Sequence, residues 1–190
     1  MLDAAGIAAL GLAAVGRNVQ ISEMARFHGA CFIEIGHDVR IDDFCVLSAG
    51  PGGIRIGDFV HVAVYCSLIG RQTIQLGDFA NLSSRVSIYS SSDDFSGASL
   101  TSPMVPDEFK QVTYAPVRLG RHVVVGSGSV VLPGVTIGDG AAIGALSLVK
   151  APCDDFGIYA GVPARRVGER RKDLLVLEHR LREQRDGVAR

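Results

Sequence analysis

The sequence predicts an all-β protein in which short parallel strands wind into a triangular β-helix. Three observations support this fold: a six-residue repeat, small residues at a fixed place within it, and a longer period of about three repeats. Each repeat begins with an aliphatic residue, often followed by Gly, and has a small residue four places on. Hexapeptide periods are typical of parallel β-helices, whose stacked coils bury one continuous core.

The repeats form two blocks that together span most of the chain. Aliphatic-Gly pairs open coils at residues 35, 56 and 76 in the first block, and at 119 and 137 in the second. Three hexapeptides make about 18 residues, so each coil is expected to place three short strands around a triangle. We therefore expect a β-helix of about six coils over residues 15–154, in which no coil can bury its apolar side alone.

The longest interruption of the repeat covers residues 89–116. This stretch is rich in Ser, Asp and Pro and carries the aromatic residues Phe95, Phe109 and Tyr114. Long loops in a regular scaffold usually carry function, and aromatic side chains favour an ordered loop because they gain by burial. We expect substrate selection to lie in this inserted loop and in the groove that faces it.

The two ends of the chain depart from the repeat. Residues 1–14 are apolar and rich in Ala, which predicts a short helix that caps the first coil. Residues 155–190 are expected to be an irregular segment followed by an amphipathic helix, because Leu174, Leu177 and Leu181 recur on one helical side. That side is expected to pack against the β-helix or against a neighbouring subunit.

Composition argues against several classes of protein. A net charge of −1 gives no general attraction to nucleic acid, and no stretch reaches the roughly 18 apolar residues of a membrane span. Cys31, Cys45 and Cys66 occupy the small slot of the repeat, so we expect them in the core rather than in a disulfide or a metal site. Free cysteines favour a reducing, cytoplasmic setting, and no metal is expected.

Two segments resemble the hexapeptide-repeat acyltransferases. They read Val-Gly-Ser-Gly-Ser-Val-Val-Leu-Pro-Gly-Val-Thr-Ile-Gly-Asp-Gly-Ala-Ala-Ile-Gly-Ala at 125–145 and Tyr-Ala-Gly-Val-Pro-Ala-Arg at 159–165. The pattern is most similar to galactoside and maltose O-acetyltransferases and to sugar acetyltransferases of polysaccharide synthesis, and the resemblance covers residues 15 to about 168.

The resemblance implies both architecture and activity. It implies a left-handed parallel β-helix, which is an exception to the right-handed crossover rule, and a homotrimer with sites between adjacent subunits. It also implies acetyl-CoA as the co-substrate, lying along the wall. The implied reaction is direct transfer of an acetyl group, in a ternary complex, to a hydroxyl or amine of a sugar or nucleotide-sugar.

The resemblance assigns five residues to coenzyme A. Ser127 matches a serine that contacts the CoA arm, and Ala145 matches an alanine that does so through its backbone. Lys150 is the cation that remains of a Thr-Lys pair near the adenosine phosphates, shifted by one place. Arg165 matches the arginine after Gly-Val-Pro-x, and Arg166 follows it. Phosphate groups need such cations or backbone N–H donors.

The general base is where this sequence departs from the family. Family members usually place a histidine at the start of the long loop, whereas this loop has none and the aligned position holds Asp93. Asp93 and Asp94 are candidate bases if burial or mutual repulsion raises a carboxyl pKa, although such pairs are also common turn formers. His61, in a Val-His-Val-Ala similar to that of nucleotide-sugar acetyltransferases, is the alternative base.

Two other readings stay open beside the acetyltransferase. A β-helix that has lost its base would serve as a scaffold or binding protein. A γ-carbonic-anhydrase-like hydratase would need three histidines on one metal, and the outward candidates His37, His61 and His122 lack the close His pair of that family. The sequence also leaves open the acceptor, the acyl group beyond acetyl, and O- against N-acylation.

Overall fold

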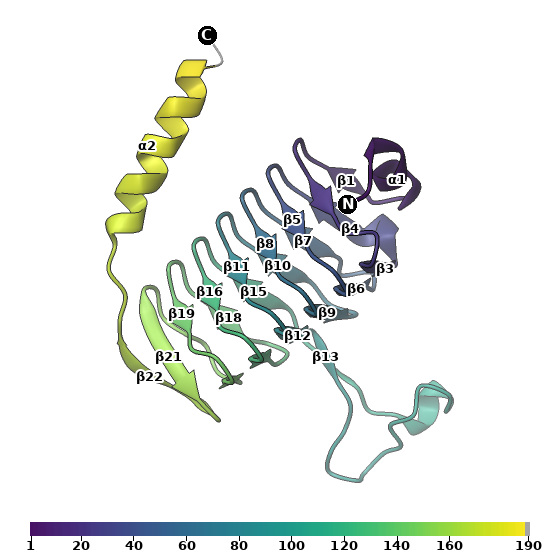
Figure 1. Ribbon diagram of the computed structural model, residues 1–190. Helices are drawn as coiled ribbons and strands as arrows, with labels where there is room; N and C mark the ends of the chain where they lie inside the picture. Colours follow the sequence, from purple (N-terminus) through teal and green to yellow (C-terminus); the bar gives the residue numbers. More distant parts are fainter. Residues whose placement is uncertain (189–190) are drawn as a thin grey trace.

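In the computed structural model, described here for residues 1–188, the chain forms a three-walled parallel β-solenoid followed by a C-terminal helix (Figure 1). The predicted all-β, parallel, triangular fold is confirmed. A short helix α1 (Ala4–Ala9) precedes the first coil. No helix within residues 1–188 has the length and apolar character needed to cross a membrane.

Each wall of the solenoid is a sheet built from one strand per coil. The first wall runs β1 (Ala14–Val15), β4 (Ile33–Ile35), β7 (Ile54–Ile56), β10 (Ile74–Leu76), β15 (Val117–Leu119) and β18 (Thr136–Ile137). The second runs β2 (Gln20–Ile21), β5 (Arg40–Ile41), β8 (His61–Val62), β11 (Asn81–Leu82), β16 (Val124–Val125), β19 (Ala142–Ile143), β21 (Gly157–Gly161) and the antiparallel β22 (Ala164–Glu169). The third runs β3 (Arg26–His28), β6 (Val46–Ala49), β9 (Ser67–Gly70), β12 (Ser87–Tyr89), β17 (Val130–Val131) and β20 (Leu148–Val149).

The core consists of aliphatic side chains that stack on their copies in neighbouring coils. Ile54, Ile74 and Val117 pair in register on three successive strands of the first wall, and each is at most 1% exposed. Complete burial of such a side chain contributes about 1.5–3 kcal/mol of transfer free energy. The six-residue repeat therefore encodes the column that holds the coils together.

The corner between the first and second walls is lined by a column of residues with positive φ. The column comprises Asn18, Asp38, Phe59, Phe79, His122, Gly140 and Phe156. Left-handed backbone costs a residue other than Gly about 1–2 kcal/mol, and ring stacking offsets part of that cost here. The ring centroids of Phe59 and Phe79 lie 4.6 Å apart, and those of Phe79 and His122 lie 4.7 Å apart.

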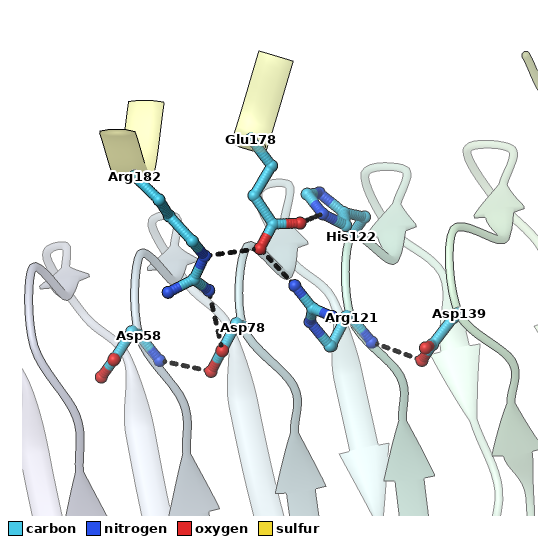
Figure 2. Close-up of polar contacts among 7 residues, drawn as sticks. All are labelled: Asp58, Asp78, Arg121, His122, Asp139, Glu178 and Arg182. Carbon is cyan, nitrogen blue, oxygen red and sulfur yellow. Dashed lines mark hydrogen bonds and ion pairs between the residues drawn. The ribbon is translucent and has the colours of Figure 1, made fainter. Parts of the chain in front are cut away.

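The predicted C-terminal helix is present as α2 (Asp173–Val188), and it lies against this corner through polar contacts. Figure 2 shows Glu178 and Arg182 reaching from α2 to His122, Arg121 and Asp78. Leu177 does not pack against the β-helix, since it is 61% exposed in the single chain, and packing of the leucine side against a neighbouring subunit stays a prediction. Because the corner presents charged groups and ring faces rather than aliphatic side chains, a charged helix face packs there instead.

The inserted residues form an arm that projects from the corner between the third and first walls (Figure 1). We use "arm" for residues 90–116. Its base is the antiparallel pair β13 (Ser91–Ser92) and β14 (Thr113–Tyr114), and its outer part carries the short helix η2 (Asp107–Phe109). The solenoid continues across the insertion, because β10 pairs directly with β15.

The cysteines follow the repeat with one exception. Cys45 and Cys66 are buried, as predicted, and their thiols donate to the carbonyls of Ala63 and Ser83 at 3.1 Å. The prediction for Cys31 is wrong: it is exposed and lies in the short helix η1 (Ala30–Phe32). Gly29 precedes that helix with φ of 63° and breaks the strand rhythm there.

Candidate active site

The arm encloses a cavity of about 720 Å³ against the solenoid. Its lining includes Arg71, Asp93, Asp94, Asp107, Lys110 and Tyr114. Arg71 comes from the solenoid corner after β9, and the other five come from the arm. The two loop aspartates singled out by the sequence therefore face a shared hollow, and no histidine within residues 1–188 lines it.

Asp94 shapes the arm rather than standing free in the cavity. Its carboxylate accepts hydrogen bonds from the Ser96 N–H at 2.8 Å, the Ser99 N–H at 3.0 Å and the Ser99 hydroxyl at 3.1 Å. The contacts with Ser96 and then Ser99 lower the pKa of Asp94 to about 2. The raised pKa required of a carboxylate base is thus not found at this residue.

Asp93 is exposed at the cavity and differs from its neighbour in its contacts. Among the side chains that the structure describes, none donates a hydrogen bond to the Asp93 carboxylate. The Ser92 hydroxyl donates to the backbone carbonyl of Asp93 instead. Such a carboxylate is free to accept a hydrogen bond or a proton from a bound substrate. The two adjacent aspartates therefore differ in how many of their hydrogen-bond acceptors are already occupied.

His61 lies on β8 of the second wall and is not part of the arm cavity. Its Nε2 lies 2.8 Å from Oδ2 of Asp42, whose Oδ1 accepts from Arg40 Nε at 2.7 Å. Burial would raise the pKa of Asp42, but the hydrogen bonds from Arg40 and His61 outweigh it and lower that pKa. Within one chain the structure therefore separates His61 from Asp93 and Asp94.

Ser127 and Ala145, two of the residues assigned to coenzyme A, lie at another corner, between the second and third walls. The Leu146 N–H donates to the Ser127 carbonyl at 2.9 Å, which places Ala145 and Ser127 on adjacent coils. The Gly144 N–H donates to the Tyr159 carbonyl at 2.7 Å, so β21 forms the next level.

Two of the three assigned cations lie near that corner, and Lys150 lies at the opposite edge of the third wall. Arg165 pairs with Ala160 of β21, and Arg166 pairs with Tyr159. Lys150 directly follows β20 of the third wall. All three are exposed, as are Ser127 and Ala145. We call this strip, made by Ser127, Ala145 and Arg165, the "small-residue corner".

Two cations of the arm cavity were missed by the sequence reasoning. Arg71 and Lys110 belong to no repeat slot that the fold requires, and they are far apart in the chain. Lys110 lies within the inserted loop itself, whereas Arg71 lies outside it, and no sequence signal links the two. Their approach depends on how the arm folds back, which the hexapeptide period does not describe.

Comparison with known proteins identifies the class to which this fold belongs. A family model described as bacterial transferase hexapeptide (six repeats) matches residues 116–151. With the 50% identical relative described next, this match shows that the chain belongs to the hexapeptide-repeat acyltransferases. The predicted family is confirmed.

Particular relatives narrow the comparison further. The dTDP-4-amino-4,6-dideoxy-D-glucose acyltransferase of Escherichia coli is 50% identical over 177 residues, covering 93% of this chain and 92% of the relative. AntD, an N-acyltransferase from Bacillus cereus solved with dTDP and 3-hydroxybutyryl-CoA, is 40% identical with a TM-score of 0.93, and 97% of each chain is covered.

A more distant relative is the galactoside O-acetyltransferase of Escherichia coli K12. It is 28% identical over 73% of this chain and 64% of its own length. A solved galactoside acetyltransferase in complex with coenzyme A has 22% identity and a TM-score of 0.59, over 88% of this chain and 70% of that one, which shows a shared fold.

Proposed function

We propose that this protein transfers an acyl group from acyl-CoA to the amine of a nucleotide-linked amino sugar. The favoured acceptor is dTDP-4-amino-4,6-dideoxyglucose, which occurs in the name of the 50% identical relative and is bound in a solved AntD variant. The observation that carries the proposal is an arm cavity lined by carboxylates and by no described histidine. The sequence left both a hydroxyl and an amine open as the acceptor group, and the proposal now selects the amine.

The chemistry of the nucleophile explains why a histidine is dispensable. A sugar hydroxyl attacks a thioester well only if a base removes its proton during the attack. A neutral amine already carries a nucleophilic lone pair, and its proton becomes acidic once the new bond forms. A carboxylate such as Asp93 is then a sufficient acceptor, and it also attracts and orients the amine beforehand.

We assign distinct roles to the two loop aspartates. Asp93 accepts a hydrogen bond from the attacking amine and takes its proton, while Asp94 holds the Ser96–Ser99 turn that shapes the cavity. AntD is known in forms with one aspartate replaced by Asn or Ala and with one serine replaced by Cys, Thr or Ala. The pair Asp93 and Asp94 is the place to make the equivalent test in this chain.

We propose that acyl-CoA lies along the small-residue corner. Ser127 and the Ala145 backbone contact its pantetheine arm, and Lys150, Arg165 and Arg166 neutralise its phosphates. AntD binds 3-hydroxybutyryl-CoA and coenzyme A, which supports acyl-CoA as the donor here. The donor acyl group is acetyl or a short hydroxyacyl group.

The positions of the arm and of the small-residue corner on the solenoid favour a homotrimer. The arm and the small-residue corner lie at opposite edges of the third wall. A closed three-fold arrangement lets the arm of one copy meet the small-residue corner of the next copy, and this completes the site. The free cysteines and the need for acyl-CoA favour the cytoplasm as its location.

The test is an acyl-transfer assay with matched acceptors. Purified protein is incubated with acetyl-CoA or 3-hydroxybutyryl-CoA, and thiol release is followed with dTDP-4-amino-4,6-dideoxyglucose or with dTDP-6-deoxyglucose, which has a hydroxyl at the same carbon. We expect thiol release and an amide product, seen by mass spectrometry, only with the amine. Equal turnover of the hydroxyl compound would overturn N-acylation, and no turnover of either would favour a scaffold.

A further inference from the structure

Arg71 is a preorganised cation at the mouth of the arm. It follows Gly70 at the end of β9, and its carbonyl accepts a hydrogen bond from the Gly52 N–H at 2.9 Å, which ties its backbone to the preceding coil. Its guanidinium carbon lies 5.4 Å from the ring centroid of Tyr114 on β14. Stacking of this kind orients the guanidinium while leaving its N–H donors available at the edge.

The charges around Arg71 are unevenly matched. Lys110 Nζ pairs with Asp107 Oδ1 at 2.8 Å, and Asp94 is occupied by Ser96 and Ser99. Among the side chains that the structure describes, no carboxylate forms an ion pair with Arg71. Among the described side chains the cavity therefore keeps one cation outside any ion pair, Arg71, whose charge also acts on Asp107, and one carboxylate without a side-chain donor, Asp93.

Arg71 also lies at the border of two hollows. Together with Val112 and Tyr114 it lines the arm cavity and a second hollow of about 340 Å³, which otherwise has mostly small residues such as Ser48, Ala49 and Gly50. A group that links two larger parts of a substrate would lie where the two hollows meet. Small residues on the far side leave room there for a second ring system.

We propose that Arg71, stacked on Tyr114, binds the diphosphate of the acceptor and so determines its specificity for a nucleotide-linked sugar. The proposal rests on the proposed function and extends it. A nucleotide amino sugar carries at one end of its sugar an amine, which is cationic until it loses a proton and becomes the nucleophile, and at the other end a diphosphate. This polarity matches Asp93 and Arg71, and the nucleoside then occupies the second hollow. A guanidinium suits the diphosphate because it can donate two parallel N–H bonds.

Binding of thymidine 5′-diphosphate to the full-length protein tests the assignment without any catalysis. Calorimetry would compare the wild type with Arg71→Ala, Arg71→Lys and the control Arg55→Ala, which removes an exposed arginine of the first wall. We expect Arg71→Ala to weaken binding about 10- to 100-fold, since a charge-assisted bidentate contact is lost. Arg71→Lys should recover part of this loss, and Arg55→Ala should bind as the wild type does.

Uncharged thymidine separates phosphate recognition from general damage to the arm. Its weaker binding should be the same in the wild type and in Arg71→Lys, whereas an equal loss of thymidine and diphosphate binding would point to a collapsed arm and overturn the assignment. Unchanged diphosphate binding in both Arg71 variants, or no binding by the wild type, would also overturn it.

A failure of the Arg71 assignment can be distinguished from a failure of the proposed function. Asp93→Asn should keep wild-type affinity for thymidine 5′-diphosphate while losing turnover. If the wild type binds the diphosphate through Arg71 but acylates no nucleotide amino sugar, the diphosphate site stands and the proposed reaction falls. If it acylates the amino sugar and Arg71→Ala leaves KM unchanged, the reaction stands and the role of Arg71 falls.

Discussion

Glu178 and His122 face each other across the contact between α2 and the solenoid, with Oε2 of Glu178 2.6 Å from Nε2 of His122 (Figure 2). Both side chains are nearly buried, at 8% and 11% exposed. Glu178 also accepts from Arg182 and Arg121, and His122 stacks on Phe79. One helix carboxylate thus connects α2 to the aromatic column of the corner.

Removing that carboxylate should loosen α2. Glu178→Ala leaves His122 and Arg121 without their shared acceptor, and we expect a loss of about 1–3 kcal/mol in the free energy of unfolding. Urea denaturation measures the loss, with Glu183→Ala as the control because Glu183 is exposed on the same helix. Equal stability of the two variants would show that α2 is held by other contacts.

The contact should also weaken in acid. Burial would raise the pKa of Glu178, but hydrogen bonds from His122 and Arg182 and the charge of Arg121 outweigh it and hold the pKa below its ordinary 4.5. Its stabilising contribution is therefore complete above about pH 4.5 and is lost as the pH falls through the lowered value. Amide exchange of α2 between pH 3 and 7 should show this loss, and Glu178→Gln should reduce it to the part that Asp38 contributes through its ion pair with Arg185.

Gly140 should be intolerant of a side chain for a local reason. It has φ of +70°, and a Cβ there would lie 2.4 Å from the Phe156 ring. We expect Gly140→Ala to destabilise the fold by about 2–4 kcal/mol, from backbone strain and overpacking together. Gly11→Ala is the matched control, with φ of +68° and nothing within 4 Å of its Cβ. Its cost in a thermal melt should be about 1 kcal/mol.

The loop aspartates should separate in kinetics. Asp93→Asn removes the proton acceptor, and we expect kcat to fall about 10²- to 10⁴-fold with folding unchanged. Asp94→Asn weakens the turn formed with Ser96 and Ser99, so KM for the acceptor should rise more than kcat falls. A large loss of activity in His61→Ala, with Asp93→Asn near the wild type, would instead assign the base to His61.

The proposed acyl-CoA site can be tested by changing the donor. Lys150→Ala should raise KM for acetyl-CoA by about 3- to 10-fold if Lys150 pairs with the adenosine phosphates. With the acetyl thioester of dephospho-CoA, the KM values of the variant and the wild type should differ less, because this donor lacks one of the phosphates. Equal ratios for the two donors would place Lys150 away from that phosphate.

The six-residue repeat predicted the core of the regular coils correctly, and its predictions failed where the chain departs from the repeat. The column of Ile54, Ile74 and Val117 follows directly from the six-residue period, because each coil must present the same slot to its neighbour. Counting along the repeat places Cys31 in the small slot that faces the core. Gly29, with its positive φ, instead turns the chain into the short helix η1, and Cys31 is exposed. Local backbone geometry of this kind is not visible in a hydrophobic period.

The candidate site was predictable in part. Asp93 and Asp94 were found because the family resemblance marks the start of the loop, and both line the cavity. Arg71 and Tyr114 meet only because the arm folds back on the corner after β9. The polar face of α2 was missed for a similar reason, since its partners are the ring faces and charges of a distant corner.

The pairing of β10 with β15 makes the arm an exchangeable segment. Strand β15, which follows the arm, pairs with β10 in the same register as β7 does on the other side of β10. The stacking of the coils therefore does not depend on the residues of the insertion. Residues 90–116 can therefore lengthen, shorten or be exchanged while the small-residue corner, at the opposite edge of the third wall, stays intact. If the arm selects the acceptor, as proposed above, replacing this one segment should change the acceptor, and an arm grafted from a relative would test it.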